Sequence, residues 1–137
     1  MFGRLDHPHP SQHDPAGFAI LRQELDEHTT VIAAEGELDL STAPRLKSLL
    51  IDSLDAGCNQ LVVDLSLVTF IDSTALAVLV GLNKRLASNV RLAIVWTSEK
   101  VLQIFEFSGT DGLFAIYPTL DEALAHVRGR LATQSDG

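Results

Sequence analysis

Two short runs rich in hydrophobic residues, at positions 18–25 and 29–34, are separated by a polar turn. The first run carries apolar residues at positions 18, 20, 21 and 25, and the second covers residues 29–34. The turn between them reads Asp26-Glu27-His28. Short runs rich in apolar and β-branched residues on either side of such a turn are typical of paired strands. We therefore predict that a β-hairpin opens the domain.

The pattern then switches between the period of a helix and that of a buried strand. Four leucines follow Pro44 at helical spacing, and Gly57 ends that helix. Beyond it we predict a strand at 61–65, a helix at 72–87, a strand at 91–96, a helix from 98 to about 109, a short strand at 114–117 and a last helix. That helix opens with a capping box, in which Thr119 caps the Glu122 amide and the Glu122 carboxylate reaches back to the Thr119 amide.

Strands that alternate with helices imply parallel pairing through right-handed crossovers. The opening hairpin adds an antiparallel edge. The predicted fold class is therefore α/β: a single domain with a mixed β-sheet of about five strands, about four helices and an opening β-hairpin.

The composition is that of a folded protein with one core. Of 137 residues, 46% are hydrophobic and 20% are charged, and a chain of this length builds a single domain. The first 16 residues contain three prolines, three histidines and few apolar groups. We therefore expect residues 1–16 to form a flexible tail, residues 17–133 the domain and residues 134–137 a disordered end. No acidic or cysteine ligand set completes a metal site around His7, His9 and His13, so a solvated tail is favoured.

The charge balance restricts the partners. Ten Lys and Arg residues against 18 Asp and Glu residues give a net charge of −8, whereas nucleic acids and anionic membranes both attract basic surfaces. We expect neither as a partner.

Residues 1–17 carry no apolar segment before a cleavage site, and a lone cysteine forms no internal disulfide, so we expect a cytoplasmic protein. For Cys58, a loop cysteine without function is favoured over a thiol sensor, because no basic residue adjoins it.

Residues 72–82, with the sequence DSTALAVLVGL, are the most informative segment. Three residues able to cap a helix stand in a row, and the eight that follow are all apolar or glycine. A helix that is apolar all round, yet too short to span a membrane, is either buried by neighbours or presents a face to a partner. A helix N-terminus stabilises negative charge, so Ser73 is a candidate for phosphorylation and Thr74 is the rival hydroxyl. The alternative is that Ser73 is only a cap and the apolar residues are only core.

Further segments extend this pattern along the chain. They are Gly36-Glu37-Leu38-Asp39, VVDLSLVTFIDSTALAVLVG, residues 98–105, Gly109, Leu113-Phe114 and residues 119–124. Their order resembles the STAS domains of bacterial anti-sigma-factor antagonists, over nearly everything from residue 18 to 127. The motif around Asp72-Ser73 is fairly specific to that family. The sequence departs from the family motif at Ala75 and Ala77, where members often have Gly. Each alanine adds a methyl group at a place where a kinase loop would approach closely.

The resemblance implies a STAS fold and a partner switch. In the family, the serine after the motif aspartate is phosphorylated by a partner that is both an anti-sigma factor and an ATP-dependent serine kinase (a GHKL ATPase). That serine is Ser73 here, with Thr74 as the alternative. The unphosphorylated antagonist binds the anti-sigma factor and so frees a sigma factor, phosphorylation releases the antagonist, and a PP2C-type phosphatase restores it.

The resemblance also implies a set of partner-binding residues: Asp39, Asp72, Ser73, Thr74, Ala75, Leu76 and Ala77. The two aspartates match acidic positions that flank the phosphorylation site of the family. Their alternatives are a loop or cap residue at Asp39 and an N-cap at Asp72.

Two other classes of function compete with a regulatory binding module. An enzyme would need a nucleophile with a paired base, and no histidine is placed beside Ser73 by the sequence, since His28 lies on a turn and His126 on a late helix. No P-loop or Gly-x-Gly-x-x-Gly pattern occurs either, so we expect neither catalysis nor a cofactor. STAS domains also occur in stress-signalling complexes and as parts of anion or lipid transport systems. There the apolar helix would dock permanently on a larger protein and its hydroxyl would be incidental.

Overall fold

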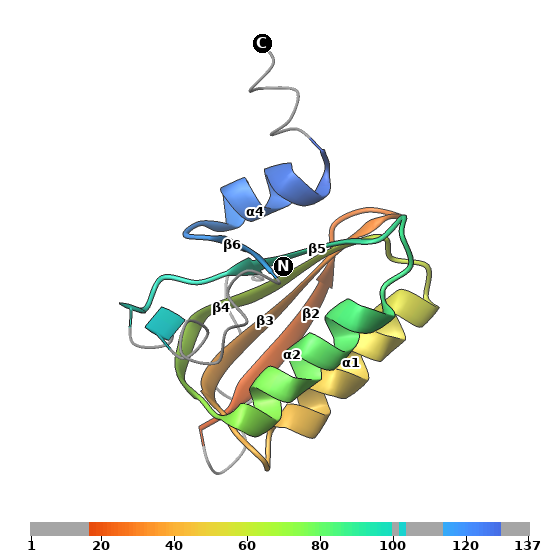
Figure 1. Ribbon diagram of the computed structural model, residues 1–137. Coiled ribbons are helices and arrows are strands. Elements are labelled where there is room, and N and C mark those ends of the chain that lie inside the picture. The colour runs from red at the N-terminus through yellow and green to blue at the C-terminus, as the bar shows by residue number, and fades with distance from the viewer. Residues whose placement is uncertain (1–16, 100–101, 104–113, 130–137) are drawn as a thin grey trace.

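The computed structural model describes residues 17–99, 102–103 and 114–129 (Figure 1). Within these residues, one five-stranded sheet has the order β2-β3-β4-β5-β6. Its strands are β2 (Ala19–Glu24), β3 (Thr29–Leu38), β4 (Gln60–Ile71), β5 (Arg91–Val95) and β6 (Ala115–Tyr117). The hairpin partners β2 and β3 are antiparallel, and every later pair is parallel. The predicted mixed sheet with an antiparallel edge is thereby confirmed.

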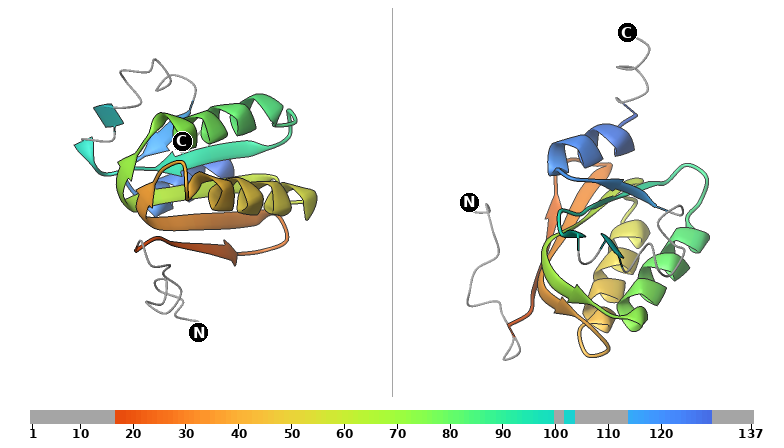
Figure 2. Two further views of the ribbon diagram at one scale, coloured as in Figure 1. Left: turned by 90° about the horizontal axis from the view of Figure 1, so that it is seen from below. Right: turned by 60° about the vertical axis from the view of Figure 1, so that its left-hand side comes forward.

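Among the described residues, α1 (Ala43–Asp55) and α2 (Ser73–Arg85) cover one face of the sheet and α4 (Leu120–Val127) covers part of the other (Figures 1 and 2). Helix α1 follows β3 and helix α2 follows β4, so both helices begin at the edge where the parallel strands end. This edge is the lower end of the molecule in Figure 1.

The main core lies between the sheet and the pair α1 and α2. Fully buried side chains from both helices and three strands meet there, including Leu46, Leu50, Leu79, Ile32, Val63 and Ile94. A smaller core fills the space under α4 and consists of Val31, Val62, Ala93, Val95, Ala123 and Val127. Burial of these apolar side chains supplies the main driving force for the fold. Among the described residues, no helix is long and apolar enough to cross a membrane.

Strand β4 is longer than the pattern predicted. The prediction covered residues 61–65, whereas the strand runs from Gln60 to Ile71. Its register against β3 shifts twice, between Ala33 and Glu35 and between Gly36 and Glu37. Irregularities of this kind bend a strand and interrupt the alternation of side chains. The second half of β4 therefore exposes two large apolar residues, Leu67 by 53% and Phe70 by 44%.

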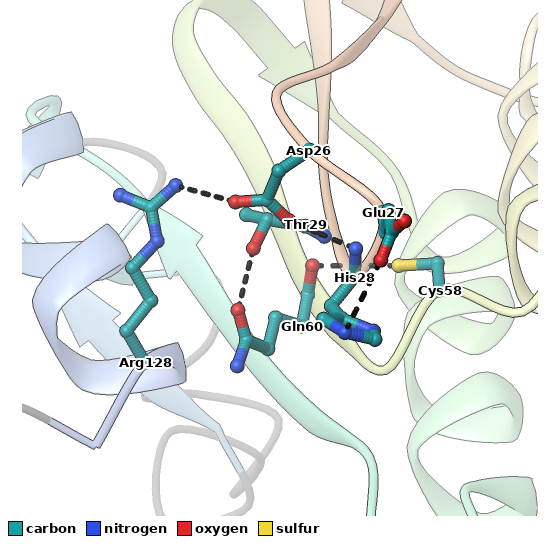
Figure 3. Close-up of polar contacts among 7 residues, drawn as sticks. All are labelled: Asp26, Glu27, His28, Thr29, Cys58, Gln60 and Arg128. Atoms are coloured by element: carbon teal, nitrogen blue, oxygen red, sulfur yellow. Dashed lines mark hydrogen bonds and ion pairs between the residues drawn. The ribbon is translucent and has the colours of Figure 1, made fainter.

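Cys58 lies in the connection between α1 and β4, and its side chain is part of the main core. Its side chain is 7% exposed, and its sulfur lies 3.3 Å from the backbone oxygen of Gln60 (Figure 3). A buried thiol in apolar surroundings is chemically inert. The structure places the side chain of this loop cysteine in the core and gives no support to a thiol sensor.

The capping box of the last helix is confirmed in one half. The Glu122 amide donates to the Thr119 hydroxyl oxygen at 3.2 Å, and that hydroxyl donates to the Glu122 carboxylate at 3.1 Å. In the described structure, the carboxylate therefore accepts a hydrogen bond from the Thr119 hydroxyl, and not from the Thr119 backbone amide as predicted. Three other expectations lie outside the described residues, wholly or for the most part: the tail 1–16, the end 134–137 and the helix at 98–109.

Candidate functional site

Two aspartates follow neighbouring parallel strands at the same edge of the sheet. Leu38, the last residue of β3, is paired in register with Ile71, the last residue of β4. Asp39 and Asp72 come directly after these two residues, and the Asp72 amide donates to the Leu38 carbonyl oxygen at 3.0 Å. The fold therefore brings together two acidic residues that are 33 positions apart in the sequence.

The carboxylate of Asp72 uses each of its oxygens for a different element. Oδ1 accepts from the backbone amide of Ala75 at 3.0 Å and caps helix α2. Oδ2 accepts from the backbone amide of Leu40 at 3.1 Å and holds the loop between β3 and α1. The alternative interpretation of Asp72 as an N-cap is confirmed, and the same side chain also ties the loop to the helix.

Asp39 organises the short loop that leads into α1. Its Oδ1 accepts from the hydroxyl of Ser41 at 2.8 Å and from the backbone amides of Ser41 and Thr42 at 3.0 and 3.2 Å. The Ser41 hydroxyl, with help from these amides, lowers the pKa of Asp39 below its ordinary value, against a smaller opposing effect of desolvation. Asp39 therefore stays ionised, in the loop role that the sequence left as an alternative.

Ser73 is the first residue of α2 and is exposed. Its hydroxyl makes no hydrogen bond within the described part of the chain, because Asp72 already caps the helix. Of the other expected partner-binding residues on α2, Ala77 is exposed and Thr74 is half-buried, whereas Ala75 and Leu76 are 0% and 6% exposed and belong to the core. Of the expected partner-binding residues on α2 after Asp72, those with side chains accessible to a partner are thus Ser73, Thr74 and Ala77.

The apolar sequence of α2 divides into two faces in the structure. The first packs in the main core through Leu76 and Leu79, and the second borders a groove between α1 and α2 of about 560 Å³. The groove is lined by Lys47, Leu50, Ile51, Leu54 and Asp55 from α1 and by Thr74, Ala77, Val78, Gly81, Leu82 and Arg85 from α2. It begins beside Ser73, since Thr74 is the next residue. The all-round apolar pattern therefore serves both burial and an accessible apolar surface.

Leu40 is the site residue that the sequence pattern did not indicate. It sits between Asp39 and the start of α1, and its side chain is 71% exposed. Its backbone amide is fixed by Asp72, so the apolar side chain is held at the surface near the start of α2. Together with the groove that begins at Thr74, it adds an exposed apolar side chain to this edge. In the sequence alone, only the position of Leu40 after the end of the predicted strand indicates that its side chain could be exposed.

The two described histidines lie far from this edge. His28 is on the turn that precedes β3, whereas Asp39 follows the end of that strand, and His126 is in α4. Across residues 17–99, 102–103 and 114–129, no three or more His, Cys, Asp or Glu side chains gather as metal ligands do.

Loss of the Asp72 side chain is expected to destabilise the protein. Asp72→Ala removes both the cap of α2 and the contact with the Leu40 amide, and we expect it to lower the free energy of unfolding by about 1–2 kcal/mol. Asp72→Asn should lie between wild type and Asp72→Ala, because the amide oxygen still caps Ala75 while the NH₂ group faces the Leu40 donor. Urea unfolding of the three proteins measures this order. A loss for Asp72→Asn as large as for Asp72→Ala would contradict a separate capping contribution.

Comparisons with known proteins agree with this architecture. The STAS domain family model matches residues 20–123. An anti-sigma-F factor antagonist, RsfB, from Mycobacterium tuberculosis is 30% identical over 99 residues, which cover 72% of this chain and 81% of the relative. An anti-sigma-B factor antagonist from Staphylococcus epidermidis is 34% identical over 82 residues, or 59% of this chain and 76% of the relative.

The likeness extends to solved structures. The crystal structure of an anti-sigma factor antagonist from Mycobacterium paratuberculosis has a TM-score of 0.77 at 30% identity, over 85% of this chain and 98% of that chain. The family match covers the whole described sheet apart from one residue of β2, and it includes the edge with Asp39, Asp72 and Ser73. The chain belongs to the STAS domain family, and its relatives include anti-sigma factor antagonists.

Proposed function

We propose that this protein is an anti-sigma-factor antagonist controlled by phosphorylation of Ser73. In its unphosphorylated form it binds an anti-sigma factor and thereby frees a sigma factor. The anti-sigma factor also acts as an ATP-dependent serine kinase of the GHKL ATPase type, and phosphorylation of Ser73 ends the complex. A PP2C-type phosphatase returns the protein to its binding form.

One observation carries this proposal: the hydroxyl of Ser73 is exposed at the start of α2 and makes no hydrogen bond in the described structure. A kinase must reach the hydroxyl that it modifies, and here no cap contact has to be broken first. Thr74 is less accessible, because it is half-buried and borders the groove. This difference favours Ser73 over Thr74 as the modified residue.

The surroundings of Ser73 explain why a phosphoryl group would change binding and not folding. At neutral pH a phosphoserine carries a charge of about −1.5 to −2. The N-terminus of α2 tolerates this charge through its backbone amides and its dipole. A partner that covers this edge would instead have to bury the phosphoryl group next to the carboxylates of Asp39 and Asp72, and like charges brought together in an interface cost several kcal/mol.

The proposed contact surface combines this edge with the apolar features next to it. Leu40 and Ala77 are exposed, and the groove between α1 and α2 starts at Thr74. Apolar side chains surrounded by polar groups are the usual composition of a protein-binding surface. The buried residues Ala75 and Leu76 support this surface from the core and do not contribute contacts of their own.

The chain is proposed to be a binding protein and not an enzyme. A serine nucleophile needs a base within hydrogen-bond reach, and the described histidines lie at other places in the fold. The phosphoryl group and the catalytic machinery must then both come from the partner.

Capture of the partner followed by phosphorylation tests the proposal. Immobilised wild-type protein is incubated with host extract, the bound protein is identified and purified, and the pair is mixed with Mg-ATP. We expect a GHKL-type ATPase to be retained and one phosphoryl group to appear on Ser73 by tandem mass spectrometry. Ser73→Ala should stay unmodified, while Thr74→Ala, the matched control, should be phosphorylated like wild type.

Two results would contradict the proposal. Phosphate on Thr74 with none on Ser73 would move the switch to the neighbouring residue. Retention of transport or stress-complex subunits by all variants, with no kinase and no phosphorylation, would replace the switch by the second class of function, a permanently docked STAS subunit.

A further inference from the structure

Exposed large apolar side chains gather at the end of the sheet that carries Ser73. The described residues contain four of them: Leu25, Leu40, Leu67 and Phe70. Leu25 lies in the connection between β2 and β3, whereas the other three lie in the second half of β4 and shortly after β3. Single apolar residues at a surface need no explanation. A group of them beside a functional edge is different, because clustered apolar side chains mark interaction sites.

Two of these side chains, Leu67 and Phe70, project from the face of the sheet that α1 and α2 leave open. Successive side chains of a strand point to opposite faces. The residues that follow them in the chain, Val68 and Ile71, are buried in the main core under α1 and α2. Leu67 and Phe70 therefore point away from these two helices, and they are 53% and 44% exposed.

Helix α4 packs on the same side of the sheet but over other parts of the strands. The core beneath it takes Val31 from β3 and Val62 from β4, both in the first halves of these strands. Figure 1 shows α4 at the upper end of the molecule and the end of β4 at the lower end. Among the described residues, neither apolar core includes Leu67 or Phe70.

Leu67 and Phe70 are neighbours on this open face. Leu67 is paired in register with Glu35 and Phe70 with Glu37, and residues two apart in a strand lie about 7 Å apart on one face. The two glutamates thus flank the apolar pair, and Glu37 is exposed. We name Leu67, Phe70 and Glu37 the β4 face.

The charge around the β4 face determines which kind of partner it suits. Asp39 and Asp72 follow the same two strands, and the chain has a net charge of −8. A second copy of the chain would bring like charges together at this face, and so would a nucleic acid or an anionic membrane. A protein surface whose apolar side chains are flanked by lysine or arginine complements both the apolar pair and the carboxylates.

We propose that the β4 face is a second contact surface for the anti-sigma factor. The partner meets Leu67 and Phe70 with apolar side chains and Glu37 with a lysine or arginine. This contact rests on the proposed function, because it belongs to the same complex. It extends the surface around Ser73 past the end of the sheet and onto the opposite face.

The β4 face contributes affinity and not the switch. Ser73 begins α2 on the other side of the sheet, and residues 67–71 of β4 span about 13 Å of strand before it. Interactions between exposed charges are largely screened beyond about 8 Å at physiological ionic strength. A phosphoryl group on Ser73 therefore leaves the contact at Leu67 unchanged, and this contact holds both forms of the protein equally.

Calorimetric titration of the full chain with the purified anti-sigma factor tests the apolar part of the contact. Leu67→Ser and Phe70→Ser are each expected to weaken binding about tenfold, as the loss of an apolar anchor at an interface does. Leu25→Ser is the matched control, because it makes the same substitution at an exposed leucine outside the β4 face. It should bind like wild type. Circular dichroism and urea unfolding check that each variant is folded.

Charge reversal tests the basic character of the partner. Glu37→Lys is expected to weaken binding about tenfold or more, because it places like charges opposite each other in the complex. Glu27→Lys makes the same change at an exposed residue in the turn before β3 and should bind like wild type.

A double-mutant cycle separates the β4 face from the switch. We expect Leu67→Ser to weaken binding by the same factor in the wild type and in Ser73→Asp, because sites without shared contacts act additively. In the kinase reaction, Leu67→Ser should raise KM about tenfold and leave kcat unchanged, since a contact made equally before and during phosphoryl transfer affects binding alone.

Several results would overturn this second contact. Unchanged affinity of Leu67→Ser and Phe70→Ser, with weakened binding of Ser73→Asp, removes the β4 face and leaves the switch in place. Dimers of the wild type that Leu67→Ser dissociates in sedimentation would show that a second copy occupies the face. If the wild type retains no GHKL-type ATPase at all, the proposed function fails and this contact fails with it.

Discussion

Ser73→Asp is expected to weaken binding to the anti-sigma factor about 30-fold, and phosphorylation of Ser73 to weaken it by more than about a hundredfold. The reason is the position of residue 73, which is exposed directly after the carboxylate of Asp72 and near that of Asp39. A new negative charge there is buried in the complex beside two like charges, at a cost of about 2 kcal/mol or more, and each 1.4 kcal/mol is about a tenfold change in affinity. Phosphoserine has the larger effect because it carries the larger charge.

Calorimetric titration of the purified anti-sigma factor with each variant measures these changes. Ser73→Ala should bind like the unphosphorylated wild type and remain bound when ATP is added. Ser88→Asp adds the same charge at an exposed serine in the turn after α2, away from the proposed surface, and should bind like wild type. If Ser73→Asp and Ser73→Ala have the same affinity, a charge switch at this residue is ruled out.

Gly36→Ala is expected to be the most damaging single methyl addition in the described structure, lowering the free energy of unfolding by about 2–5 kcal/mol. Gly36 has φ = +105°, a backbone conformation that is strained for any other residue. A Cβ at this position would also lie 2.7 Å from the backbone oxygen of Gly17 and 3.2 Å from Cα of Phe18. Backbone atoms cannot rotate away, so β3 and the residues entering β2 must separate.

Two further glycines serve as controls that isolate each contribution. Gly57 has φ = +102° but nothing within 4 Å of an added Cβ, so Gly57→Ala should show the conformational strain alone, about 1–2 kcal/mol. Gly81 lies in the middle of α2, has no positive φ and likewise has free space around it. Gly81→Ala should therefore stabilise the protein by about 0.5–1 kcal/mol. Urea unfolding of all three variants tests this order, and a Gly36→Ala loss no larger than that of Gly57→Ala would contradict the backbone clash.

The sequence predicted the architecture because its elements have simple periods. The helical spacing of leucines in α1 corresponds to one buried face, and the apolar run that predicted β3 corresponds to a strand whose first half is buried on both faces. The full length of β4 could not be predicted. Two register shifts expose Leu67 and Phe70, so the second half of the strand lacks the pattern of a buried strand. Burial of Cys58 was also missed, since the packing of α1 against the sheet, and not the local sequence, decides which side of the turn faces the core.

At the candidate site, local signals predicted the residue types but not their contacts. The N-cap role of Asp72 follows from its place before a helix, and the structure confirms it. Its second bond, to the Leu40 amide, depends on the pairing of two strands that are distant in sequence. The division of α2 into exposed Ala77 and buried Ala75 and Leu76 likewise depends on which side of the helix meets the sheet. A run of apolar residues contains no such information.

The common origin of α1 and α2 at one edge of the sheet has a consequence for the conditions under which the proposed switch works. Both helix dipoles direct their positive ends toward the edge that carries Ser73, so they offset part of the charge of a phosphoryl group. What opposes the partner is then the residual repulsion among charges that the complex buries. Salt screens buried charges much less than exposed ones, whose interactions fade beyond about 8 Å at physiological ionic strength. Phosphorylation should therefore still separate the two proteins when the ionic strength rises.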